Sequence, residues 1–169
     1  MQRYRFMEVS MACTSVQAME DFWTGMFDGK VLFRGLMAGQ PFSRMIACGV
    51  TLVFREDPAM TVPPGPGQEV QYRNHLGIRV DDLEAAIADL EAKGARFTMT
   101  PALVREWQKK QDPGTGAYLQ TTYIAPPLSR ERITSGEYRH DVAIFPGPDN
   151  LWIELNEVHE PTDAQWFPA

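Results

Sequence analysis

The chain has 169 residues, a formal net charge of -6 and a hydrophobic content of 44%. A chain of this size and composition can bury one substantial core or two small fused modules, and it is too apolar to be disordered. The net negative charge argues against a nucleic-acid partner, because binding to phosphates requires clustered Lys and Arg side chains.

The first half of the sequence predicts a strand, a helix and three further strands. Residues 4–12 alternate between apolar and polar, and apolar side chains then recur at helical spacing. Thr14 and Gln17 form a helix-start signal in front of that apolar stripe. The expected bounds are 4–12 for the first strand, 15–27 for the helix, and 29–35, 42–48 and 50–56 for the later strands. A segment rich in Pro and Gly follows and predicts a linker over 59–70.

The second half repeats this order with a longer interior. A helix-start signal, Asp81 with Glu84, precedes an apolar stripe that ends at Gly94. The expected bounds are 72–80 for a strand, 82–93 for the helix, and 95–100, 117–124, 139–145 and 150–157 for the later strands. The extra length, residues 101–138, is expected to be an irregular insertion that contains loops.

The two halves therefore contain an internal duplication, which constrains the fold more than any single motif does. The same local pattern begins at Glu8 in the first copy and at His75 in the second. We expect one α+β domain over 1–169 that is built from two βαβββ modules. Module one is 1–58, the linker is 59–70, module two is 71–158 with the insertion 101–138, and the tail is 159–169.

No part of the sequence suggests a membrane or secreted protein. The longest nearly apolar run, residues 45–54, is far shorter than the roughly 20 residues that span a bilayer. Residues 1–5 lead into the first strand without the apolar stretch of a secretory signal. We therefore expect a cytoplasmic protein without a membrane partner.

Two segments of the second half resemble a known family. They are residues 74–83, NHLGIRVDDL, and residues 145–155, FPGPDNLWIEL, with Gly147 at a position where Asp is usual. Together with residues 8–23 they resemble the vicinal oxygen chelate superfamily. This superfamily includes glyoxalase I, bleomycin-resistance proteins, fosfomycin-resistance enzymes and extradiol ring-cleaving dioxygenases. The resemblance implies that the two modules form a half-open, cup-shaped mixed sheet, and that the protein is a homodimer.

The resemblance also implies a metal site inside that cup. Its ligand positions fall on Glu8, His75 and Glu154, whereas the fourth strand offers Val53 or Phe54 and supplies no ligand. One imidazole and two carboxylates, with open coordination positions, suit a catalytic divalent metal such as Mn²⁺, Fe²⁺ or Zn²⁺.

Such a site implies an isomerase, lyase or epimerase that acts on a small substrate with two chelating oxygens. The metal would stabilise an enolate-like intermediate, and Glu8 or Glu154 is the candidate catalytic base. Two alternatives stay open at this point. One is an Fe²⁺ ring-cleaving dioxygenase. In such enzymes a catalytic histidine precedes the equivalent glutamate by a longer interval than the fourteen positions from His140 to Glu154, which argues against this alternative. The other is a metal-free binding protein that resembles bleomycin-resistance proteins.

Aromatic residues on the predicted strands and in the insertion suggest a small-molecule pocket. Apolar walls with a few convergent polar groups are typical of such pockets, and they favour a partly aromatic or apolar substrate. The predicted pocket residues are Phe54, Trp107, Tyr123, His140 and Trp152.

Overall fold

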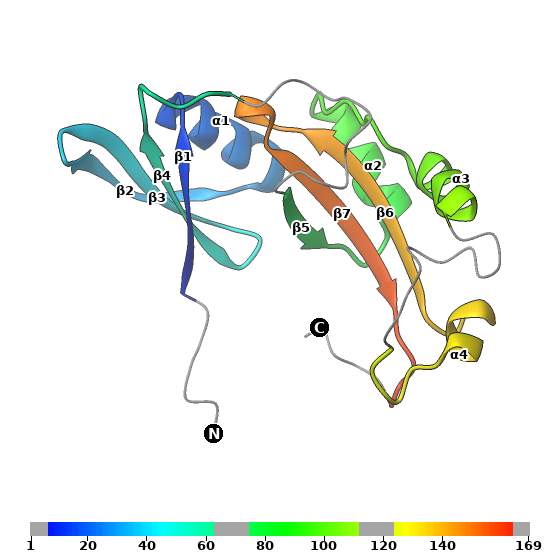
Figure 1. Ribbon diagram of the computed structural model, residues 1–169. Coiled ribbons are helices and arrows are strands. Elements are labelled where there is room, and N and C mark those ends of the chain that lie inside the picture. Colours follow the sequence, from blue (N-terminus) through cyan, green and yellow to red (C-terminus); the bar gives the residue numbers. More distant parts are fainter. Residues whose placement is uncertain (1–6, 63–74, 112–123, 164–169) are drawn as a thin grey trace. The chain divides into compact units, whose positions relative to one another are not determined.

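The computed structural model describes residues 7–62, 75–111 and 124–163, with the side chains of 107–111 excepted. The chain forms two compact units (Figure 1). Unit 1 consists of residues 1–74, 93–95 and 146–152, and unit 2 consists of residues 75–92, 96–145 and 153–169. The α+β class predicted from the sequence is confirmed. No helix in the described part of the chain is long and apolar enough to cross a membrane.

Unit 1 contains the predicted strand, helix and three strands. The elements are β1 (Glu8–Cys13), α1 (Val16–Phe27), β2 (Lys30–Met37), β3 (Gln40–Ala47) and β4 (Val50–Glu56). They form a mixed sheet in the order β1-β4-β3-β2, in which β1 and β4 are parallel and the other pairs are antiparallel. The first strand of the module therefore lies beside its last strand.

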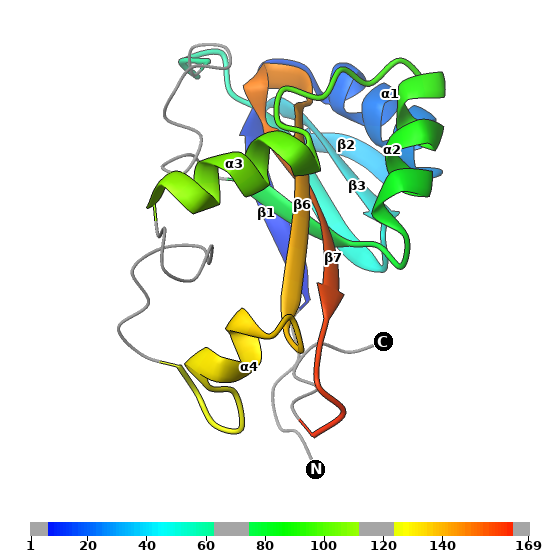
Figure 2. The same cartoon turned by 90° about the vertical axis from the view of Figure 1, so that its right-hand side faces the viewer.

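The register of this sheet decides which side chains share a face. Val53 on β4 lies opposite both Ser10 on β1 and Arg44 on β3. Because side chains alternate along a strand, these residues share one face with Glu8, and Phe54 lies on the other face. Helix α1 packs against β3 and β4 (Figures 1 and 2). Its residues Met19 and Trp23 are almost fully buried in the core of unit 1.

Glu20 is a buried residue of α1, and it forms an ion pair with Arg34 of β2. The Nε atom of Arg34 donates to both carboxylate oxygens, at 2.9 and 2.8 Å, although the Glu20 side chain is only 2% exposed. This hydrogen bonding holds the pKa of the Glu20 carboxyl below its usual value. The stability that the pair contributes is therefore present above the ordinary carboxyl pKa, and it is lost as the pH falls through the lowered pKa.

Glu20→Gln is expected to lower the free energy of unfolding by about 1–3 kcal/mol at neutral pH, because the charged partner of Arg34 is removed. The loss should shrink as the pH falls through the lowered pKa of Glu20, because the wild-type carboxyl is then also protonated. Urea denaturation at a series of pH values measures both effects. Glu91→Gln, an exposed carboxylate on another helix, is the control. An equal difference in stability at every pH would contradict the role given to this ion pair.

The first helix of each unit begins one residue later than the sequence predicted. The side chain of Ser15, rather than Thr14, caps α1 by accepting from the amide three positions further on. In the same way, Asp82 rather than Asp81 accepts from the amide of Ala85 at the start of the next helix. A capping side chain must be at the last non-helical residue to reach that amide, and Thr14 and Asp81 each lie one position earlier, in a bend.

Thr14 has a different role, because it joins β1 to the closing motif of the sequence. Its amide and its hydroxyl both donate to the carboxylate of Asp149, at 2.7 and 2.5 Å. Asp149 lies in the short helix η2 (Pro148–Asn150), and Glu56 accepts from the amide of Val16 nearby. Two carboxylates therefore stabilise the N-terminus of α1, whose free amides favour negative charge.

Asp149→Ala is expected to lower the free energy of unfolding by about 1–2 kcal/mol, which is the range of a lost helix-terminal acceptor. Thr14→Val removes the hydroxyl donor of the same contact, so the two losses should not add in the double variant. Thermal or urea denaturation of the four proteins in this cycle measures the coupling. Strictly additive losses would show that the two side chains do not act through each other.

The described residues of unit 2 form a smaller sheet and three helices. The elements are β5 (His75–Arg79), α2 (Leu83–Ala92), α3 (Pro101–Gln111), α4 (Arg130–Thr134), β6 (Arg139–Pro146) and β7 (Trp152–His159). The last residue of β6 and the first residue of β7 belong to unit 1. The strand order is β5-β7-β6. The first and last strands of this module are again neighbours, as in unit 1, which is the arrangement expected of a duplication.

The predicted strand over 95–100 and the predicted irregular insertion were wrong in part. The strand is reduced to a single bridge between Met99 and Ile144. Thr100 ends it, because the carbonyl and the hydroxyl of Thr100 accept from the first amides of α3. The insertion 101–138 contains the helices α3 and α4. Most of the predicted strand over 117–124 lies outside the described residues.

Candidate metal centre

His75 and Glu154 lie close together on neighbouring strands of unit 2. His75 is the first residue of β5, and Glu154 is the third residue of β7. The Nε2 atom of His75 is 3.9 Å from the Oε2 atom of Glu154, and the two side chains are 46% and 14% exposed. The two side chains therefore lie near each other, and their role as metal ligands stays a prediction.

His140 lies on the same face of this sheet. Its Nε2 atom is 2.5 Å from the Oδ1 atom of Asn156, and the amide nitrogen of Asn156 donates to the carbonyl of Glu154. Gly77 leaves room for this amide, since a Cβ at that position would be 3.2 Å from the Nδ2 atom of Asn156. His140 and Asn156 are therefore fixed near Glu154, and they provide the polar groups that a ligand on this face would meet.

Glu8, the third predicted ligand, has a basic partner in unit 1. Nη2 of Arg44 donates to Oε2 of Glu8, and the guanidinium group lies 5.6 Å from the centroid of the Phe33 ring. Arg44 is not among the residues predicted from the sequence. The alternation of residues 42–46 would have placed it on one face with Phe42 and Ile46, but only the register with β4 brings it beside Glu8.

The donors fit a divalent metal in part. Metal–nitrogen and metal–oxygen bonds of about 2.0–2.2 Å allow one ion to contact two atoms that are 3.9 Å apart, as His75 and Glu154 are. No group of three or more His, Cys, Asp and Glu side chains within 7–62, 75–106 and 124–163 is arranged to hold an ion. Glu8 belongs to unit 1 and the other two to unit 2, so the three-residue ligand set stays a prediction.

The predicted pocket residues fall into three groups. Phe54 and Trp152 are buried, with 0% and 1% of their surfaces exposed. His140 is half-buried and lies near Glu154 as described above. The side chains of Trp107 and Tyr123 lie outside the described residues. Phe54 is on the face of its sheet opposite to Glu8, which makes it a core residue of unit 1.

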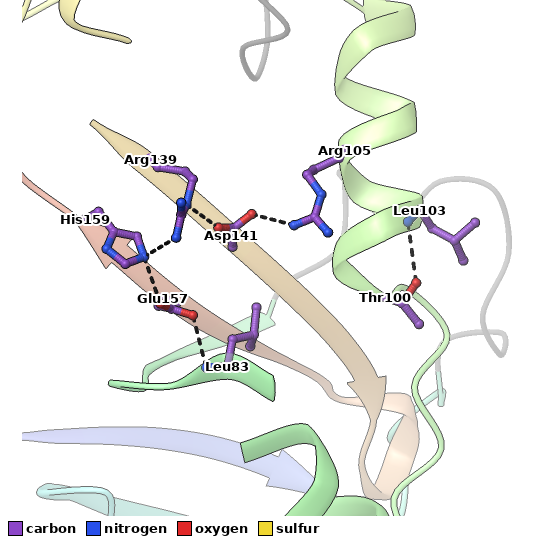
Figure 3. A network of polar contacts seen from close by, with 8 residues as sticks. All are labelled: Leu83, Thr100, Leu103, Arg105, Arg139, Asp141, Glu157 and His159. Atoms are coloured by element: carbon purple, nitrogen blue, oxygen red, sulfur yellow. Dashed lines mark hydrogen bonds and ion pairs between the residues drawn. The ribbon is translucent and has the colours of Figure 1, made fainter. Parts of the chain in front are cut away.

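A second polar cluster lies on the other face of β6 and β7 (Figure 3). Asp141 accepts from Arg139 at 2.6 Å and from Arg105 of α3 at 2.9 Å. Glu157 accepts from the amide of Leu83 at the start of α2. These residues line a hollow of about 360 Å³ in unit 2. The cluster fastens both helices to the sheet.

This cluster is separate from the His75–Glu154 pair. Glu154 and Glu157 are three positions apart on one strand, so their side chains point to opposite faces. His159 lies beside Glu157 and Arg139, with contacts of 2.7 and 2.6 Å (Figure 3). Substitution of Glu157 is therefore a control for substitution of Glu154, because both carboxylates lie on β7 but on opposite faces.

Comparison with known proteins identifies the family. A family model described as a glyoxalase-like domain matches residues 8–117, which is more than half of the chain. The chain belongs to the glyoxalase-like domain family. This family lies within the vicinal oxygen chelate superfamily, so the resemblance noted in the sequence is confirmed. No curated protein matches the chain.

Solved structures of similar fold agree with this assignment. A glyoxylase/bleomycin resistance protein/dioxygenase domain from Frankia sp. EAN1pec is 18% identical, with a TM-score of 0.55 over 92% of this chain and 98% of that one. A glyoxalase family protein from Enterococcus faecalis is 15% identical, with a TM-score of 0.56 and the same two coverages, 92% and 98%. The fosfomycin resistance protein FosX from Listeria monocytogenes, in complex with Mn(II) and sulfate, is 12% identical, with a TM-score of 0.51 over 92% and 93%. At these identities the likeness concerns the fold alone.

Proposed function

We propose that this protein is a metal-dependent enzyme of the vicinal oxygen chelate type. The observation that carries the proposal is the pair formed by His75 and Glu154, whose donor atoms are 3.9 Å apart on adjacent strands. These two residues would hold a divalent metal, with Glu8 as the third ligand. FosX from Listeria monocytogenes binds Mn(II) on a similar fold, which supports Mn²⁺ among the three candidates Mn²⁺, Fe²⁺ and Zn²⁺.

The proposed reaction is an isomerisation, lyase or epimerase step on a small substrate with two neighbouring oxygens. A bound divalent metal would supply Lewis-acid polarisation of those oxygens. Glu8 would act as the base that removes an adjacent proton, and Arg44 orients its carboxylate. Glu154 is the other candidate base. Asn156 and His140 would offer hydrogen bonds to the substrate from the same face as Glu154.

A second candidate is a metal-free small-molecule-binding protein. The ion pair between Glu8 and Arg44 favours it, because a carboxylate that is already neutralised by a guanidinium group is a weaker metal ligand. In this case the face of unit 1 that carries Glu8 and Arg44 would bind an organic ligand without catalysis.

Elemental analysis of protein purified without chelator separates the two candidates. The enzyme should carry close to one Mn, Fe or Zn per chain, and Mn²⁺ titration of the stripped protein should restore that ratio. Protein with no metal and no Mn²⁺ binding would overturn the first candidate and leave the second. Oxygen uptake with catechol under Fe²⁺ loading would instead point to the ring-cleaving chemistry. We also propose that the protein is a cytoplasmic homodimer, which sedimentation and cell fractionation can test.

A further inference from the structure

Arg44 has hydrogen-bonding capacity that its contacts do not use. A guanidinium group carries five N–H donors. Nη2 of Arg44 donates to Glu8, whereas Nε is buried without an acceptor among the described residues. A buried donor without an acceptor costs free energy and calls for an explanation. A ligand atom that accepts a hydrogen bond from Arg44 would explain this unused donor.

The surroundings of Arg44 are aromatic. Its guanidinium lies over Phe33, which is 48% exposed, and the rings of Phe33 and Phe42 meet edge to face with centroids 5.8 Å apart. Gly35 makes room for this arrangement, because a Cβ there would lie 3.0 Å from the Phe42 ring. A fixed cation therefore adjoins two aromatic rings on the face of the sheet that carries Glu8.

We propose that Arg44 binds the anionic group of the ligand, and that the ligand is an apolar or aromatic carboxylate or phosphonate whose body packs on Phe33 and Phe42. A guanidinium group binds such anions through two parallel N–H donors. The inference rests on the proposed function only in placing the ligand on this face of unit 1.

Glu8 has a definite role in this arrangement, because it competes with the ligand for Arg44. Its carboxylate occupies one N–H edge of the guanidinium and cancels its charge. Removing that carboxylate frees Arg44 for an anion, whereas removing Arg44 leaves no cation for the ligand. The two substitutions therefore have effects of opposite sign on anion binding. If the ion pair were purely structural, the two substitutions would not have opposite effects on anion binding.

The test is calorimetric titration of the full chain with phenylphosphonate and, as a neutral aromatic probe, benzyl alcohol. EDTA is present throughout, so that any bound metal makes no contribution. Wild-type protein should bind phenylphosphonate more tightly than benzyl alcohol. Arg44→Gln should weaken phenylphosphonate binding at least about 10-fold, as expected when a charged hydrogen-bond partner is lost, and should leave benzyl alcohol unaffected. Glu8→Gln should strengthen phenylphosphonate binding.

Two controls keep the result interpretable. Arg105→Gln removes another ion-paired arginine, on α3 of unit 2, and should leave both probes unaffected. Thermal melting shows whether Arg44→Gln is folded, and Arg44→Lys, which keeps the charge but loses the fork, should bind phenylphosphonate with intermediate affinity. Equal binding by wild type and Arg44→Gln, equal affinity for both probes, or weaker binding by Glu8→Gln would overturn the proposal. If the protein binds no metal but shows these effects on phenylphosphonate binding, only the proposal of a metal-dependent enzyme is contradicted.

Discussion

His75→Ala and Glu154→Ala are each expected to weaken Mn²⁺ binding more than about 100-fold. Outer partners of metal ligands alone are worth about 10–100-fold in affinity, so the loss of a direct ligand should exceed that range. The two donor atoms are 3.9 Å apart on neighbouring strands, and either substitution leaves the other donor in place. Mn²⁺ titration followed by calorimetry or electron paramagnetic resonance measures the change.

The opposite face of β7 supplies the matched controls. Glu157→Ala removes a carboxylate and His159→Ala removes an imidazole, both from the side of the sheet that faces away from Glu154. Neither should change Mn²⁺ affinity. Glu157 accepts from the amide of Leu83, so its variant also needs a check of folding. Unchanged Mn²⁺ binding by both His75→Ala and Glu154→Ala would remove the proposed ligand set.

Glu8→Gln tests the third ligand separately. Because Arg44 already neutralises Glu8, the loss of Mn²⁺ affinity should be smaller for this variant than for His75→Ala or Glu154→Ala. An unchanged affinity would reduce the protein ligands to two. A loss as large as those of the other two variants would mean that the metal displaces Arg44 from Glu8.

The order of elements in unit 1 was predictable because each element has strong local signals. The apolar stripe of α1 recurs at helical spacing, and the turns between the strands are marked by glycine, as at Gly49. The wrong predictions fall where the alternation typical of a strand competes with the start of a following helix. The predicted strand over 95–100 ends early because Thr100 caps α3, a contact that alternation alone does not reveal.

The candidate site was predictable only in part. His75 and Glu154 follow from the duplicated pattern and the closing motif, whereas Arg44 does not belong to either motif. The sequence left Val53 and Phe54 as alternatives on the fourth strand, because a shift of one residue in a strand exchanges its two faces. Pairing of β4 with β1 and β3 resolves this point, since Val53 shares a face with Glu8 and Arg44. Long-range register of this kind is not encoded within a single strand.

Phe54→Ala is expected to lower the free energy of unfolding by about 3–5 kcal/mol, which is the usual cost of removing a large aromatic side chain from a core. Phe54 is 0% exposed and lies on the sheet face opposite to Glu8. Urea denaturation measures the loss. Phe54→Leu, which keeps most of the apolar volume, should cost much less.

Ligand affinity distinguishes this core role from the wall of a pocket, which the sequence suggested for Phe54. Phe33→Ala is the matched comparison, because Phe33 is 48% exposed beside Arg44 and its loss should cost little stability. Phenylphosphonate affinity should fall in Phe33→Ala, and it should stay unchanged in the folded fraction of Phe54→Ala. The reverse pattern, with stability intact and affinity lost in Phe54→Ala, would place Phe54 in the pocket after all.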